Sequence, residues 1–69
     1  MMKRIFVDGM VCMHCKESVE NALKAIVGIN DVRVSLEDKC AQINTIYEID
    51  DEVLKSTITD IGFEIILIQ

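Results

Sequence analysis

The sequence contains no proline and no tryptophan, and its only aromatic residues are two phenylalanines and one tyrosine. Because 51% of the residues are hydrophobic, a packed core is expected, and aliphatic side chains must build most of it. The longest uninterrupted apolar run is Ile65–Ile68, far short of the roughly 18 residues that cross a bilayer. We therefore expect a soluble protein with no membrane insertion.

Basic residues are also scarce. The sequence has seven lysines and arginines and twelve acidic residues, which gives a formal net charge of −5. Nucleic acids and anionic membranes attract proteins of the opposite sign. The charge therefore argues against both as partners and favours a protein partner with a basic docking face.

Cysteine is limited to three residues, Cys12, Cys15 and Cys40, which cannot all pair with one another. No secretory segment with a charged start and an apolar stretch precedes Lys3 and Arg4. Both observations favour a reducing, cytoplasmic location over a disulfide scaffold. The 69 residues are expected to form one domain, 1–69, that buries only about 60% of its unfolded surface. Metal binding would then add appreciably to a small margin of stability.

The apolar pattern predicts the order strand–helix–strand twice over. Strands are expected over 3–7, 32–36, from 41 towards 47, and over 63–68. A first helix is expected from about Cys15 to Val27, ended by Gly28, with an inward stripe of Val19, Ala22, Leu23 and Ile26. A second begins after Asp50 or Asp51 and ends at Gly62, with Leu54, Ile58 and Ile61 inward and Val53 supporting them. Ile46 beside Tyr47 indicates a register change or bulge at the end of the third strand.

The stretch from Asp8 to Cys15 joins the first strand to the first helix. Gly9 lets the backbone turn, so Cys12 is expected in the loop and Cys15 in the first helical turn. Unpaired N–H groups and the positive end of the helix dipole favour the thiolate, which is the form that binds metal. In the predicted order of strands and helices, the turn at 37–39 and the Gly62–Phe63 junction are expected at the same end of the fold as Cys12 and Cys15.

The number of thiols narrows the choice of metal. Two soft sulfur ligands suit an ion of low coordination number, such as Cu(I) or Hg(II). A structural zinc site would require four ligands, and no second pair follows in the sequence.

The motif Gly9-Met10-x-Cys12-x-x-Cys15 resembles the signature of heavy-metal-associated domains, and among them the small bacterial copper chaperones. The Gly28-Ile29 pair, Val32-x-Val34 and the Gly62-Phe63 pair extend the resemblance over nearly the whole chain. It implies a ferredoxin-like βαββαβ fold of the α+β class, with a four-stranded antiparallel sheet and two helices on one face. It also implies Cu(I) held by Cys12 and Cys15, and delivery of that ion to a copper-transporting P-type ATPase.

The neighbours of the two cysteines have less direct roles. We expect Met10 to be an apolar plug below the loop rather than a third ligand, and His14 to be exposed or to act behind the ligands rather than bind metal. Family resemblance makes Phe63 a cover that shields the thiolates from water. Cys40 is expected to be a small apolar strand residue, with a shared site between two molecules as the alternative. The apo protein is expected to be a monomer, and the loaded protein a weak metal-bridged homodimer.

Three further functions remain open from the sequence. The chain matches what an excised metal-binding domain of an ATPase would look like, and also a mercury- or zinc-handling relative. From another class, C-x-x-C at a helix start suits a thiol–disulfide oxidoreductase. Against it stand the short chain and the lack of a proline for the cis turn that such folds place beside their active site. The leading hypothesis is a Cu(I) carrier that works by thiolate exchange, which needs no enzyme chemistry.

Overall fold

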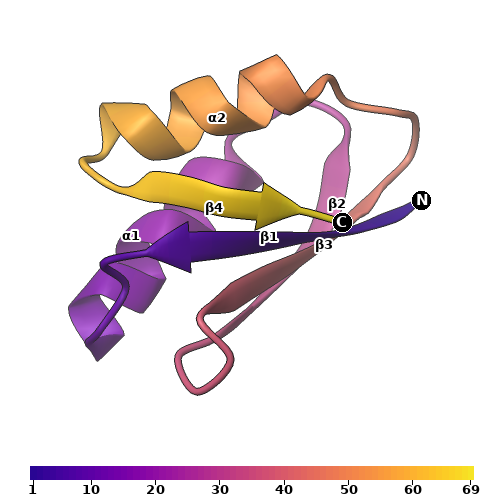
Figure 1. Ribbon diagram of the computed structural model, residues 1–69. Helices are drawn as coiled ribbons and strands as arrows, with labels where there is room; N and C mark the ends of the chain where they lie inside the picture. Colours follow the sequence, from indigo (N-terminus) through magenta and orange to yellow (C-terminus); the bar gives the residue numbers. More distant parts are fainter.

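The computed structural model describes all 69 residues, 1–69. The elements in order are β1 (Met2–Asp8), α1 (Met13–Lys24), β2 (Ile29–Ser35), β3 (Cys40–Thr45), α2 (Asp51–Asp60) and β4 (Glu64–Ile68). The strands form one antiparallel sheet in the order β2-β3-β1-β4. Both helices cover the same face of this sheet, α1 against β2 and α2 against β4 (Figure 1). The expected ferredoxin-like βαββαβ fold is confirmed.

The core lies between the sheet and the two helices. Ile5 and Val7 alternate inward from β1 and are fully buried, as the period of two in a strand requires. Val19 and Leu23 of α1, one helical turn apart, are buried against them. The other members of the buried cluster are Met10, Val32, Ala41, Ile43, Ile49, Leu54 and Ile58. All are aliphatic or sulfur-containing, which confirms the prediction made from the lack of aromatic residues.

The first helix differs from its predicted bounds at both ends. It begins at Met13, two residues early, because Cys12 acts as its N-cap. It ends at Lys24, with Ala25 as C-cap in a right-handed conformation, so Gly28 does not cap it. Gly28, at φ +101°, instead turns the chain into β2. A Cβ atom there would lie 2.7 Å from the ring of Tyr47, so the position also needs glycine for space.

The second helix also needs two corrections. Asp50 is its N-cap, as predicted, but its side chain makes no capping hydrogen bond. Leu54 and Ile58 are buried, whereas Ile61 is 37% and Val53 43% exposed, so neither belongs to the inward stripe. Ile61 is outside because the helix ends at Asp60, and Gly62, with φ +92°, then reverses the chain as predicted.

The sheet has two register irregularities, and one lies near the predicted place. β3 ends at Thr45, so Ile46 and Tyr47 belong to the following loop, but a register change does occur opposite the last residues of β3, Asn44 and Thr45. One shift occurs between Phe6 and Val7 where β1 pairs with β4. Another occurs between Ile29 and Asp31 where β2 pairs with β3.

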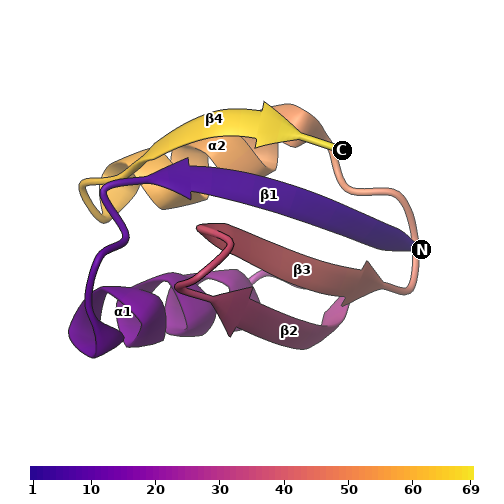
Figure 2. The same ribbon diagram turned by 60° about the horizontal axis from the view of Figure 1, so that its bottom comes forward.

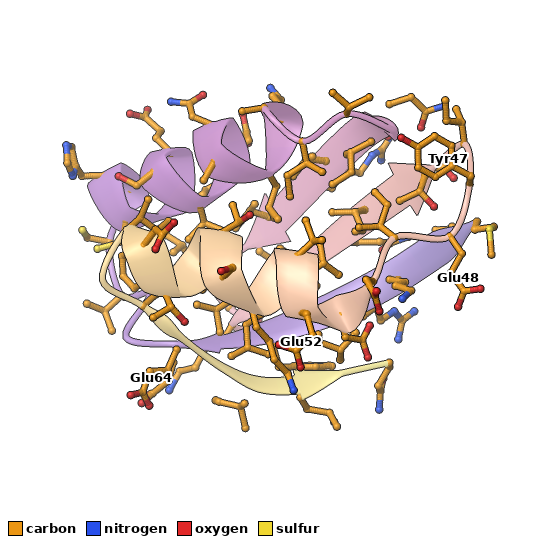
Figure 3. The ribbon with its side chains drawn as sticks, turned by 90° about the horizontal axis from the view of Figure 1, so that it is seen from above. Tyr47, Glu48, Glu52 and Glu64 are labelled. Carbon is orange, nitrogen blue, oxygen red and sulfur yellow. The ribbon has the colours of Figure 1, made fainter.

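The predicted placement of the loops is confirmed. The last residues of β1 and β2 and the first residues of β4 lie at the same end of the sheet. This follows because β3 is antiparallel to both β1 and β2, and β4 is antiparallel to β1. The N–H of Val7 donates to the carbonyl of Lys39 at 3.0 Å, which ties the β2–β3 turn to β1 at this end. Figure 3 shows Tyr47 and Glu48 at the end of the molecule opposite Glu64. Neither helix has the length and apolarity to cross a membrane.

Candidate metal centre

The loop between β1 and α1 is held in place by its first two residues. Gly9 adopts φ +87°, a left-handed conformation that other residues reach only with strain, and this turns the chain away from β1. A Cβ atom on Gly9 would lie 3.5 Å from the Phe63 ring, so the two residues are neighbours. Met10, only 1% exposed, belongs to the core cluster. The loop is therefore anchored at one side by a buried side chain.

Cys12 and Cys15 meet at the start of α1. Cys12, in an extended conformation with φ −142°, is the N-cap, and its Sγ accepts the N–H of Cys15 at 3.4 Å. Sulfur here takes the role that a serine or aspartate oxygen has in common caps. The two Sγ atoms lie 3.1 Å apart, and all three cysteines are free thiols. The predicted placement, Cys12 in the loop and Cys15 in the first turn, is confirmed.

The electrostatics of this corner favour a thiolate at Cys12. Hydrogen bonds from the Cys15 side chain, and then from the backbone of Cys15 and His14, lower the pKa of the Cys12 thiol from its ordinary value. The first turn of α1 contains no acidic residue, so no nearby carboxylate opposes the positive end of the helix dipole. A thiolate is the nucleophilic and metal-binding form of cysteine, so the loop presents the chemistry that a soft metal requires.

The two cysteines differ in exposure. Cys12 is exposed, whereas Cys15 is half-buried and packs against the core cluster. His14, between them, is exposed, as expected. Val11 and Met13, the sequence neighbours of Cys12, are 77% and 59% exposed, so the loop presents two apolar side chains to solvent. Sequence reasoning did not single out these two residues, and no alternation marks them, because Cys12 between them is exposed as well.

Cys40 lies in a different setting. It starts β3, pairs with Phe6 of β1 and Ser35 of β2, and is 9% exposed. Burial raises the pKa of its thiol, an effect that the nearby Arg4 charge partly opposes. Cys40 is therefore a neutral, apolar strand residue, as expected. It lies at the same end of the sheet as the loop, but on the face that the helices leave open.

No group of three or more histidine, cysteine, aspartate or glutamate side chains is arranged to hold a metal ion. The donors that the structure brings together at the loop are the two sulfurs of Cys12 and Cys15. Two thiolates and no third donor fit a soft ion of low coordination number and do not make a tetrahedral zinc site.

Comparison with known proteins assigns the chain to a family. The heavy-metal-associated domain model matches residues 4–64. The chain belongs to the heavy-metal-associated domain family. This confirms the resemblance inferred from the motif Gly9-Met10-x-Cys12-x-x-Cys15, all of whose residues fall within the matched range.

Relatives of this heavy-metal-associated domain include both small proteins and parts of large ones. The copper chaperone CopZ of Staphylococcus aureus (strain MRSA252) is 38% identical over 64 residues, which are 87% of this chain and 90% of that protein. Copper-transporting ATPase HMA5 of Oryza sativa subsp. japonica is 41% identical over 65 residues, which are 91% of this chain and only 6% of the ATPase. The solved structure of a CopZ metallochaperone has a TM-score of 0.88 at 30% identity, covering 96% of this chain and 100% of that one.

Proposed function

We propose that the chain binds one Cu(I) ion as cargo through the thiolates of Cys12 and Cys15 and passes it to a protein acceptor. The observation that carries this proposal is the pair of sulfurs, 3.1 Å apart, at the exposed start of a helix. The lowered pKa of Cys12 supports it, because it favours the thiolate, the form of cysteine that binds metal.

The choice of Cu(I) follows from the donor set and from the relatives. Thiolate is a soft ligand, and d10 ions such as Cu(I) accept two of them. A copper chaperone and a copper-transporting ATPase are among the relatives. Hg(II) fits the same two sulfurs, and Zn(II) fits only if another molecule supplies further ligands.

The different exposure of the two cysteines suggests how transfer proceeds. An incoming thiolate reaches the ion from the open side of the loop and adds as a third sulfur. Cys12, which is exposed, leaves first, and the half-buried Cys15 releases the ion last. Only metal–sulfur bonds form and break, so no enzyme chemistry is needed. We propose a copper-transporting P-type ATPase as acceptor and the cytoplasm as the compartment that keeps the thiols reduced.

Four residues would support this site without holding the ion. Gly9 gives the loop its turn, and buried Met10 fixes the loop to the core. Phe63, packed beside Gly9, would limit the access of water from the side of β4. His14 is exposed next to Cys15, where it lies beside the ligands without being one of them.

Anaerobic titration of reduced protein with Cu(I), in competition with a chromogenic chelator, tests the assignment. We expect one Cu(I) per chain in the original protein and in Cys40→Ser, the matched control. Cys12→Ser and Cys15→Ser should each lose tight binding. Repeating the titration with Zn(II) and Hg(II) would identify the preferred metal. Loss of binding in Cys40→Ser alone would show that the ligands are wrongly assigned.

A second candidate, thiol–disulfide exchange, is favoured by the same short distance between the sulfurs and by the lowered pKa of Cys12. An insulin-reduction assay with a dithiol reductant separates the two functions. Turnover that depends on both Cys12 and Cys15 and survives copper chelation would support an oxidoreductase. A rate no higher than that of the reductant alone, with 1:1 Cu(I) binding, would support the carrier.

A further inference from the structure

The chain has only two arginines, Arg4 and Arg33, and both lie on the open face of the sheet. Figure 2 shows this face turned forward, with α1 and α2 behind the strands. Ile5 points inward and is fully buried, so its neighbour Arg4 points outward. Val32 is likewise buried, which places Arg33 outward.

The strand register sets the two arginines in one row. Gln42 of β3 is opposite Arg4 of β1 on one side and opposite Arg33 of β2 on the other. Adjacent strands lie about 4.8 Å apart, so the two arginine Cα atoms are roughly 10 Å apart across the sheet. The next row, in the same order of strands, is Phe6, Cys40 and Ser35.

These two rows line a cleft of about 470 Å³, which we call the arginine cleft. Its lining residues are Arg4, Phe6, Arg33, Val34, Ser35, Asp38, Cys40 and Gln42. Asp38 is the only carboxylate among them, and its backbone N–H donates to the Ser35 hydroxyl at 3.2 Å, which fixes the β2–β3 turn beside the cleft.

Neither guanidinium is strongly paired within the chain. Arg4 takes part in no salt bridge. Arg33 approaches Asp31 at 3.5 Å, but the two side chains are 82% and 57% exposed, and such pairs contribute little. The Gln42 amide reaches only the Met2 sulfur, at 4.0 Å. The residues that line the cleft include two arginines and one aspartate, so their formal charge is positive in a chain whose net charge is −5.

We propose that the arginine cleft docks an acidic, extended segment of a partner protein, at a surface separate from Cys12 and Cys15. Each guanidinium would take one carboxylate, with bidentate geometry available to both. Carboxylates two residues apart in an extended segment lie on the same side, about 7 Å apart, and two flexible arginine side chains whose Cα atoms are roughly 10 Å apart can reach both. Phe6, half-buried in the neighbouring row, adds an apolar side chain to the cleft.

The spacing and exposure favour a protein segment over a free small anion. A single small anion would have to be shared by the two guanidinium groups, whereas a segment offers one carboxylate to each and gains from the linkage. A second copy of the chain is disfavoured as occupant because both copies carry −5.

The test is a titration of ¹⁵N-labelled, reduced, metal-free protein with a blocked hexaglutamate peptide at low salt, followed by NMR. We expect amide shifts centred on residues 4, 33 and 42, no such shifts with hexaglutamine, and weaker binding as salt increases. The double variant Arg4→Gln/Arg33→Gln should bind about two- to thirty-fold more weakly. Lys24→Gln/Lys55→Gln removes the same charge from the two helices and is the matched control, which should bind as the original does.

Several outcomes would overturn the proposal. Equal weakening in the lysine control would mean that net charge alone attracts the peptide, and shifts centred elsewhere would mean another surface. Succinate binding as tightly as the peptide would identify a small-anion site. The same amides shifting with protein concentration, without peptide, would identify a second copy as the occupant. If the double variant does not fold, Arg33→Gln, at an 82% exposed side chain, gives the same comparison with a smaller effect.

Discussion

Replacing Met10 with alanine should show how strongly the metal loop depends on the core. Met10 is 1% exposed and belongs to the buried cluster that includes Ile5 and Val7. Truncation of a buried methionine to alanine typically costs about 2–5 kcal/mol, through lost burial and the cavity left behind. A 69-residue chain is expected to have only about 3.5–10 kcal/mol of stability in total. Met10→Ala should therefore remove a large fraction of the free energy of unfolding.

Urea denaturation of reduced, metal-free protein, followed by circular dichroism, measures this loss. With a slope of about 1 kcal/mol per molar urea, the midpoint should fall by roughly 2 M or more. Met10→Leu, which keeps the volume, should cost less than about 1.5 kcal/mol. Val11→Ala is the neighbouring control; because Val11 is 77% exposed, it should change stability by no more than about 0.5 kcal/mol. If Met10→Ala cost no more than Val11→Ala, the idea that Met10 anchors the loop would be refuted.

Three other predictions concern the thiols and their surroundings. His14→Ala should keep one Cu(I) per chain, and a nitrogen ligand seen by X-ray absorption that disappears in this variant would contradict it. In metal-free Cys40→Ser protein, where Cys12 keeps Cys15 beside it, thiolate absorbance should show a first ionisation below the ordinary thiol pKa of about 8.5, and in Cys12→Ser/Cys15→Ser protein Cys40 should ionise above it. By linkage, the lowered pKa of Cys12 contributes stability above the ordinary thiol pKa, and this contribution is lost as the pH falls through the lowered pKa. The raised pKa of Cys40 contributes stability below the ordinary thiol pKa, and this contribution is lost as the pH rises through the raised pKa. Cu(I)-loaded protein should form a weak dimer in which the two metal loops face each other; the dimer should become more stable at higher salt and should dissociate when a competing small thiol is added. If sedimentation showed the same fraction of dimer without metal, the contact would instead be made by the apolar last strand.

Much of the fold followed from local sequence patterns. The alternation in β1 and the spacing of Val19 and Leu23 predicted their burial, because one sheet face and one helix stripe must be apolar. The positions of Cys12 and Cys15 at a helix start were also predictable from the glycine and the onset of the helical pattern.

The remaining details depend on tertiary pairing. The start of α1 was misplaced because a cysteine sulfur is an unusual N-cap acceptor, so Cys12 gave no capping signal. The register shift between Phe6 and Val7 arises only when β4 pairs with β1, and nothing local to either strand specifies it. The row of Arg4, Gln42 and Arg33 comes from three strands that are distant in sequence, so only the register could reveal it.

Both ends of the chain lie together, far from the thiols. The N–H of Thr45 donates to the carbonyl of Met1, and Gln69 exchanges backbone hydrogen bonds with Arg4, so each terminus is held at the start of β1 (Figures 1 and 2). Cys12 follows the other end of that strand. A linker, tag or neighbouring domain joined at either terminus would leave the loop uncovered. A domain with this arrangement can work alone or as one domain of a longer chain. This agrees with the relatives, because the matched region is 90% of one protein and 6% of another.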